Sequence, residues 1–424
     1  MNQTGQGNME WLEFGLREAF RKDAQSILGG LLNDPQLAVA NDRAMDGERC
    51  YRQRAKTIQT LFGPVEVRRN YYHGDTGTEG RVPLDEALGL IEGHSPALAK
   101  LMCRAGAQSP FEAASADLRA YGAIEVEGRQ IQRMANAVAP AMRKTLQAET
   151  AEIASDAGAR PLEVIYVSAD GTGIPMVKKE LEGNAGRQPD GSAKTREVKL
   201  GCVFTQHGVD EEGRPMRDHE SSSYVATLES SSDFGGILRK EAFRRGMPSA
   251  LKLVFLGDGA VWVWEVARIN FPGAIEILDF YHASEHLVEL CNTLFGKASD
   301  KSKTQCETWK LRFKEDGVDE VIAEAQAALP RSGPRRKEAK KQIAYFQKNR
   351  KRMLYATFRA AGYFIGSGVV EAGCRTVVGQ RLKQSGMFWS SNGAQNVLAI
   401  RSALLSNRFD HYWDELNHSL PAAA

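Results

Sequence analysis

The chain has 424 residues, of which 42% are hydrophobic and 25% are charged. This length allows two or three domains with cores of their own, and the composition excludes a mostly disordered or fibrous chain. The 55 basic and 53 acidic residues give a formal net charge of +2, so the total charge does not indicate a nucleic-acid partner and only its distribution can.

Cysteine usage and hydropathy indicate a cytoplasmic protein. The six cysteines include no closely spaced pair of the zinc-ribbon or redox kind, and a chain of this length needs no disulfides. The first ten residues are polar and lack the pattern of a secretory signal. The most apolar stretch, 251–271, contains Asp258, Glu265 and Arg268, so we expect no membrane helix and no membrane partner.

Residues 1–94 form an N-terminal region with few clear patterns. The turn at Gly63-Pro64 precedes two strand-like segments, 65–67 and 70–72, which we interpret as a short strand pair. From residue 95 to about residue 155 the apolar residues recur every three or four positions, which predicts a mainly helical region.

Within 95–155 the pattern resembles a helix-turn-helix. Pro110 fits the first turn of one helix, Gly122 fits the turn, and a second helix from Glu127 would direct Arg129 and Arg133 outward. The second helix of such a motif can enter a DNA groove, so we predict that these two arginines bind DNA. An ordinary helical hairpin with a solvated basic face explains the same pattern equally well.

A change of period near residue 160 predicts an α/β fold. Helices are expected between the last three strands, through 234–242 and 262–269. Three strands followed by helix, strand, helix and strand describe a mixed five-stranded sheet with an antiparallel meander, the order of RNase H-like domains. We assign residues 160–288 and 364–406 to this core. The expected strands are 162–168, 198–204, 223–227, 251–256 and 274–280.

A basic helical insertion, residues 289–363, interrupts the core. Between Arg331 and Arg352 there are ten Lys or Arg residues and one acid, Glu338. A solvated helix face is the usual explanation of such a run, but the interleaved Tyr345 and Phe346 favour contact with phosphates. The candidate DNA-binding residues here are Arg335, Arg336, Lys337, Lys340 and Lys341. Residues 407–424 are interpreted as a C-terminal tail.

Three acids occupy positions where a charge is costly. Asp170 and Asp258 each end an apolar strand and precede a glycine, and Glu371 lies in the segment 366–373 at the start of the last long helix. A carboxylate among apolar neighbours must be paired, protonated or bound to a cation. If the three converge, they form an oxygen-rich site for two hard divalent ions that support phosphoryl transfer. Each Asp-Gly taken alone is more typical of a hairpin turn.

A second cluster follows the fifth strand. His282, Glu285 and His286 fit the H-x-x-E-H pattern of inverted zinc peptidases, in which two histidines four residues apart share a zinc ion. We expect His282 at the end of a strand rather than inside a helix, which disfavours that pattern. Asp279 as an ordinary helix cap is the structural alternative.

Four stretches surround these residues: Ser168-Ala-Asp-Gly-Thr-Gly-Ile-Pro175, Leu256-Gly-Asp-Gly-Ala260, Ile277-Leu-Asp-Phe-Tyr-His-Ala-Ser-Glu-His-Leu287 and Gly366-Ser-Gly-Val-Val-Glu371 with its continuation to Ser390. Together they resemble the DDE transposases of bacterial insertion sequences, most closely the ISKra-type group, over roughly residues 162–405. Residues 63–90 resemble the amino-terminal part of that group.

The resemblance implies that Asp170, Asp258 and Glu371 are catalytic acids that bind two Mg²⁺ or Mn²⁺ ions on an RNase H-like core. It also implies that Asp279 and His282, which match the Asp-x-x-His element of Mutator-like transposases, belong to the catalytic site. Trp389 is expected in the core rather than stacked on a base. Further candidates for binding DNA phosphates are Arg375, Arg381 and Lys383.

The function that the resemblance implies is a DNA transposase that binds terminal inverted repeats, cleaves a strand and joins it to target DNA. Its partners would be element ends and target DNA, with a homodimer or higher homo-oligomer, a nucleoid-associated location in the cytoplasm and no small-molecule cofactor. Two alternatives stay open: a zinc metallopeptidase that uses His282, Glu285 and His286, and a catalytically inactive RNase H-like DNA-binding protein.

Overall fold

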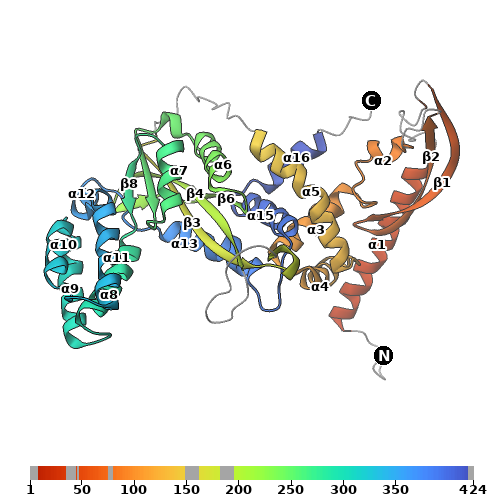
Figure 1. Cartoon of the computed structure of the whole chain (residues 1–424). Helices are drawn as coiled ribbons and strands as arrows, with labels where there is room; N and C mark the ends of the chain where they lie inside the picture. Colours follow the sequence, from red (N-terminus) through yellow and green to blue (C-terminus); the bar gives the residue numbers. More distant parts are fainter. Residues whose placement is uncertain are drawn as a thin grey trace. The chain divides into compact units, whose positions relative to one another are not determined.

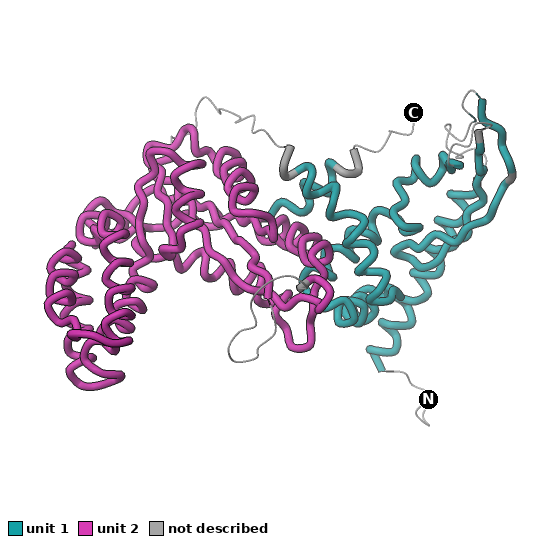
Figure 2. The backbone as a smooth tube through the Cα atoms, in the orientation of Figure 1, with its two compact units in different colours: residues 1–145, 407–424 teal, residues 146–406 magenta. Residues whose placement is uncertain are grey.

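The computed structural model describes residues 8–34, 44, 47–74, 80–148, 162–181 and 195–418 (Figure 1). The chain forms two compact units, residues 1–145 with 407–424 and residues 146–406 (Figure 2). The expected boundaries at residues 155 and 160 lie outside the described residues. The segment expected as a C-terminal tail contains helix α16 (Phe409–His418), which belongs to the first unit.

The first unit begins with a long helix and a hairpin. Helix α1 (Met9–Asn33) packs against strands β1 (Glu48–Thr60) and β2 (Gly63–Gly74), which pair in antiparallel fashion. The segments 65–67 and 70–72 both lie on β2, so their interpretation as a strand pair is wrong. The partner is β1, in which polar residues dominate, and its sequence therefore carried no strong strand signal.

The predicted helices of this unit are confirmed. Leu98, Met102, Ile131 and Met134 are buried, as their spacing predicts. Arg129 and Arg133, together with the neighbouring Gln132, are exposed, as expected for the outward face of the second helix. The helices are α2 (Pro83–Ala87), α3 (Pro96–Gln108), α4 (Phe111–Gly122) and α5 (Gly128–Ala148).

The second unit is built on a mixed sheet of six strands, which confirms the α/β class. All five predicted strands are present, and a short strand, β5, adds a sixth after the turn that follows Val209. The meander is antiparallel: β4 pairs with β3, and both β5 and β6 pair with β4. Strand β7 is parallel to β3, and β8 is parallel to β7. The strands are β3 (Val164–Pro175), β4 (Thr195–Val209), β5 (Pro215–Arg217), β6 (Ser223–Thr227), β7 (Lys252–Gly257) and β8 (Ile275–Leu278).

Strand β3 does not end at Asp170. It continues to Pro175, paired residue by residue with β4, so the expected turn after Asp170 is absent. The two glycines there serve close packing: a Cβ at Gly171 would lie 2.4 Å from the Glu197 carboxylate, and one at Gly173 would lie 2.8 Å from the Thr195 hydroxyl. Glycine therefore marks a close cross-strand approach here instead of a turn.

Helices cover the sheet and build the insertion. The 289–363 region is helical, as predicted, and its Trp309, Phe313 and Phe346 belong to the same apolar core as Phe255 of β7. The fifth strand ends at Leu278, because Asp279 caps α8. None of the described helices is both long and apolar enough to cross a membrane. The helices and helical turns are η1 (Lys178–Leu181), α6 (Ser231–Arg244), η2 (Met247–Ser249), α7 (Val261–Asn270), α8 (Phe280–Phe295), α9 (Asp300–Phe313), α10 (Val318–Ala327), α11 (Pro334–Asn349), η3 (Arg350–Arg352), α12 (Tyr355–Ala360), α13 (Gly368–Gly373), the π-helical segment η4 (Cys374–Gly379), α14 (Gln380–Leu382) and α15 (Ser391–Leu405).

Candidate active site

The three predicted acids line one cavity of about 260 Å³ in the second unit. Asp170 and Asp258 come together because β3 and β7 are neighbouring parallel strands, in which Ala169 pairs with Gly257 and each acid follows its paired residue. Carboxyl ends of parallel strands meet at one edge of a sheet. Helix α13 adds Glu371. The lining residues are Ala169, Asp170, Asp258, Tyr281, His282, Glu285, Ser367 and Glu371.

Asp170 is half-buried and hydrogen-bonded through both carboxylate oxygens. The Gly171 amide donates to Oδ1 (2.6 Å), and the Cys374 thiol donates to Oδ2 (3.3 Å). Burial raises the pKa of Asp170, and the nearby charge of Asp258 adds to the increase; the two hydrogen bonds and His282 oppose it. Cys374 lies in the π-helical segment that follows Glu371. This segment therefore contacts Asp170, while helix α13 directly before it carries Glu371.

Asp258 is held by its own turn and by the insertion. Its Oδ1 accepts from the Ala260 amide (2.9 Å), and its carbonyl accepts from the Tyr345 hydroxyl (3.0 Å). Gly259 has φ of +97°, and a Cβ there would lie 2.5 Å from the Tyr345 hydroxyl oxygen, so both conformation and space require glycine. Helix α7 follows directly, and therefore the hairpin interpretation of this Asp-Gly is wrong. Burial, with Asp258 and Asp279, raises the pKa of Tyr345.

Asp279 is fully buried and is not among the residues that line the cavity. Its Oδ1 accepts the His282 amide (2.5 Å) and its Oδ2 accepts the Ser367 amide. The helix-cap alternative is therefore confirmed, and Asp279 links the start of α8 to the segment that leads into α13. Glu371 itself is exposed and accepts a hydrogen bond from the Ser367 hydroxyl (3.1 Å).

His282 lies in the first turn of α8, so its expected position at a strand end is wrong. Its Nδ1 is 3.6 Å from Glu285 Oε2, and its ring centroid is 5.1 Å from that of His286. His286 stacks on Tyr345 at 3.9 Å, and its Nδ1 lies 2.7 Å from Gln342 Oε1. Within the described ranges, no three or more His, Cys, Asp or Glu side chains are spaced as ligands of one metal ion.

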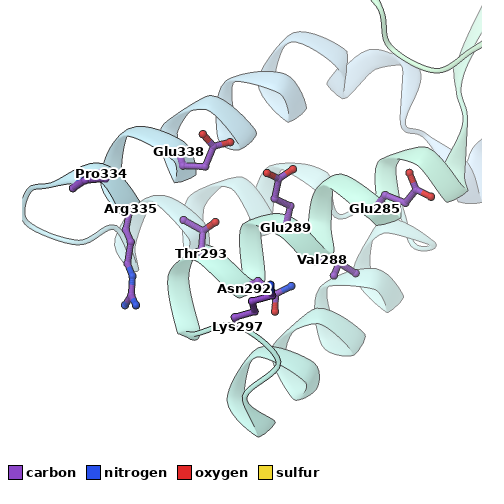
Figure 3. A pocket seen from close by; sticks show the side chains of 9 residues that line it. All are labelled: Glu285, Val288, Glu289, Asn292, Thr293, Lys297, Pro334, Arg335 and Glu338. Carbon is purple, nitrogen blue, oxygen red and sulfur yellow. The ribbon is translucent and has the colours of Figure 1, made fainter. Parts of the chain in front are cut away.

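A second cavity, of about 650 Å³, lies between α8 and α11 (Figure 3). Glu285 lines both cavities, so the two adjoin. Figure 3 shows Glu285 at one end of the second cavity and Arg335 near the other, with Glu289 and Glu338 between them. The basic helix α11 thus borders a cavity that shares the lining residue Glu285 with the cavity of the three acids.

The basic residues of α11 fall into two groups. Arg336 is half-buried and donates to the Pro330 carbonyl (2.6 Å), so it supports the chain locally. Phe346 is buried and Tyr345 contacts Asp258, so these aromatic residues face the interior and do not strengthen the expectation of phosphate contact. The exposed candidates are Arg335, Lys337, Lys340 and Lys341.

The candidate DNA-binding residues that follow Glu371 also differ in exposure. Arg375 and Lys383 are exposed, and the Lys383 ammonium donates to the Thr172 hydroxyl two residues after Asp170. Arg381 is 1% exposed, with its guanidinium 5.0 Å from the Trp389 ring, and burial lowers its pKa to about 10. The predicted phosphate contact therefore does not extend to Arg381. Trp389 is a core residue, as expected.

Sequence reasoning missed Tyr345, Cys374 and Ser367, which hold the acids. Ser367 lies in the matched motif before Glu371, and Cys374 lies one turn beyond it, so helical spacing could have indicated both. Tyr345 had no such signal, because its contact with Asp258 depends on how the insertion packs.

Comparison with known proteins gives a family. A protein of Streptococcus gallolyticus called "UPF0236 protein in vanSb 3′region" is 23% identical over 390 residues, which are 88% of this chain and 78% of that protein. The model of an uncharacterised protein family, UPF0236, matches residues 4–409. Since this match covers nearly the whole chain, the protein belongs to the UPF0236 family.

Proposed function

We propose that this protein is a metal-dependent DNA transposase in which Asp170, Asp258 and Glu371 bind two Mg²⁺ or Mn²⁺ ions. The observation that carries the proposal is that these acids, which come from three distant segments, line one cavity. The strand order supports it: an antiparallel meander of β6, β4 and β3 followed by parallel β7 and β8 is the order of RNase H-like folds, and the first two acids directly follow the last residue pair between β3 and β7.

The donor set fits hard divalent cations. The described lining of the cavity contains four carboxylates, those of Asp170, Asp258, Glu285 and Glu371, and no Lys or Arg. Carboxylate oxygens are the preferred ligands of Mg²⁺, and a cation would relieve the repulsion that helps raise the pKa of Asp170. Because the acids are not spaced as ligands of one ion, the proposal requires the exposed Glu371 side chain to turn inward when cations bind.

Different residues hold the different parts of the proposed catalytic site. Gly171 and Cys374 orient Asp170, Tyr345 and Ala260 fix Asp258, and Asp279 fixes the backbone at His282 and Ser367. Bound divalent ions would activate the attacking oxygen and stabilise the leaving one.

In the first step, water forms a bond to phosphorus as the 3′-oxygen leaves; in the second, that 3′-hydroxyl attacks a target phosphodiester and displaces another 3′-oxygen. The exposed basic side chains of α11, together with Arg375 and Lys383, would bind DNA phosphates. The ends of two DNA segments must be held together, so a homo-oligomer is part of the proposal.

Strand cleavage tests the proposal. The substrate is a labelled duplex that carries the sequences flanking the gene, incubated with Mg²⁺ and resolved on a denaturing gel. Asp258→Asn should reduce cleavage and joining by about a thousandfold or more, while Glu265→Gln, an exposed acid on α7, should leave both unchanged. Full activity of Asp258→Asn would overturn the proposal.

Active-site variants also distinguish the two alternative functions, a zinc peptidase and an inactive DNA-binding protein. A zinc peptidase would lose peptide hydrolysis with Glu285→Gln and keep it with Asp258→Asn. If the protein is an inactive DNA-binding protein, the wild type and both variants should bind the duplex, and none of the three should cleave it.

A further inference from the structure

His286 packs against the insertion and not against the cavity of the three acids. His282 and Glu285 line that cavity, whereas His286, one turn beyond His282 on α8, is not among its described lining residues. The half-buried His286 ring stacks on Tyr345 of α11, with ring centroids 3.9 Å apart and an angle of 23° between the planes. Neither cation binding nor phosphate binding by the residues named so far accounts for this contact.

Hydrogen bonds from α11 fix the His286 ring. Gln342 is 2% exposed, and its Nε2 donates to Glu338 Oε1 at 3.1 Å. Its Oε1 therefore faces His286 and accepts a hydrogen bond from His286 Nδ1 at 2.7 Å. Since an amide oxygen can only accept, the proton of the neutral ring lies on Nδ1. Glu338 is the one acid in the basic run 331–352, and it orients the amide that holds His286.

These contacts come from one side of α11. Glu338, Gln342 and Tyr345 are spaced by four and three residues, so their side chains lie above one another on the helix. Lys337 and Lys340 are exposed and lie outside this stripe. The helix therefore contacts the proposed catalytic site with one side while its lysines on another side remain open to solvent.

Tyr345 connects this arrangement to Asp258. Its hydroxyl donates to the Asp258 carbonyl at 3.0 Å, and Gly259 has φ of +97°. Glycine adopts positive and negative φ at little cost, so the peptide between Asp258 and Gly259 needs a partner to hold one orientation. The bond from Tyr345 selects the orientation in which Asp258 Oδ1 accepts from the Ala260 amide (2.9 Å). The direction of this carboxylate therefore depends on the position of the Tyr345 ring.

We propose that His286 is a positioning residue: held by Gln342, it fixes the ring of Tyr345 and, through that ring, the Asp258 carboxylate for cation binding. This inference rests on the proposed function, in which Asp258 binds a divalent ion. Groups that orient a metal ligand without touching the metal change metal affinity by about 10- to 100-fold when they are removed. This role of His286 does not involve a zinc ion.

Cation binding by the full chain tests the proposal. Titration with Mn²⁺, followed by the electron paramagnetic resonance of the free ion, gives the dissociation constant without DNA. His286→Ala and Tyr345→Phe should each raise it by about tenfold or more. The double variant should bind no more weakly than the weaker single variant, because both changes interrupt the same chain of contacts. His411→Ala and Tyr121→Phe, which alter exposed residues of the first unit, are the matched controls and should bind Mn²⁺ like the wild type.

Strand cleavage distinguishes positioning from a general loss of structure. At saturating Mg²⁺ both variants should regain most of the wild-type rate, and their affinity for the labelled duplex should be unchanged. Tyr345→Phe removes a single oxygen atom, so it tests the contact even if His286→Ala lowers the stability of the fold.

The outcomes separate this inference from the proposed function. Unchanged Mn²⁺ binding in both variants, or effects that multiply in the double variant, would overturn the inference, while weaker binding by Asp258→Asn would still support the proposed metal site. Weaker Mn²⁺ binding by the variants of a chain that cleaves no DNA would support the inference and contradict the transposase. A wild type that binds no Mn²⁺ would contradict both.

Discussion

At the scale of single residues, the contacts of Asp170 determine how its protonation is linked to folding. Burial and Asp258 raise its pKa above the value in the unfolded chain, against the hydrogen bonds from Cys374 and Gly171. Protonation therefore favours the folded state: this contribution is fully present below the unfolded pKa and is lost as pH rises through the folded pKa. Asp170→Asn removes it. Without divalent ions, the melting temperature of Asp170→Asn relative to wild type should rise as pH increases from the unfolded pKa through the folded pKa of Asp170.

Calorimetry across that pH range measures the difference directly, and Glu265→Gln provides the control for an exposed acid. Mg²⁺ should reduce the difference by stabilising the wild type more than the variant, because a ligand that binds only the folded state raises its stability. A difference that does not change with pH would show that Asp170 titrates as in the unfolded chain.

At the scale of elements, α11 combines packing with exposed charge. Arg352, just beyond its end, bonds Glu276 at 2.6 Å, whereas Lys337 and Lys340 are exposed. If the exposed lysines contact DNA phosphates, Lys337→Glu with Lys340→Glu should weaken binding similarly for all sequences. The slope of log affinity against log salt should fall by about two. Fluorescence anisotropy over a KCl series measures both quantities. Lys301→Glu with Lys303→Glu on α9 is the matched control, and an equal effect of the two pairs would argue against a specific role of α11.

The elements also show what could be predicted from the sequence. Strands β3 and β7 were recognisable because both faces are buried and their residues are continuously apolar. The two acids that follow these apolar runs, Asp170 and Asp258, were likewise visible. The extension of β3 was missed because Gly171 reads as a turn residue, and β1 was missed because its exposed polar residues hide the period. The contact of Tyr345 with Asp258 depends on the packing of α11, which no local pattern encodes.

At the scale of the whole molecule, the C-terminal helix α16 belongs to the unit that the N-terminal residues begin. It leaves this unit after residue 145 and returns to it at residue 407 with α16. The segment interpreted as a tail is therefore structural: Phe409, Tyr412 and Trp413 are each at most 2% exposed. The first unit cannot acquire its full core until the C-terminal helix has been made, so its folding depends on contacts between residues far apart in the sequence, such as Arg104 and Asp410.

The strength of that contact should come from packing rather than from charge. Trp413→Ala removes a buried aromatic side chain and should lower the free energy of unfolding of the first unit by about 3–5 kcal/mol. Asp410 pairs with Lys100 (2.8 Å) and Arg104 (3.3 Å), but it is exposed, so Asp410→Ala should cost less than about 1 kcal/mol. Urea unfolding followed by circular dichroism compares the two variants. Equal losses would mean that the ion pairs contribute as much as the Trp413 side chain to attaching α16 to its unit.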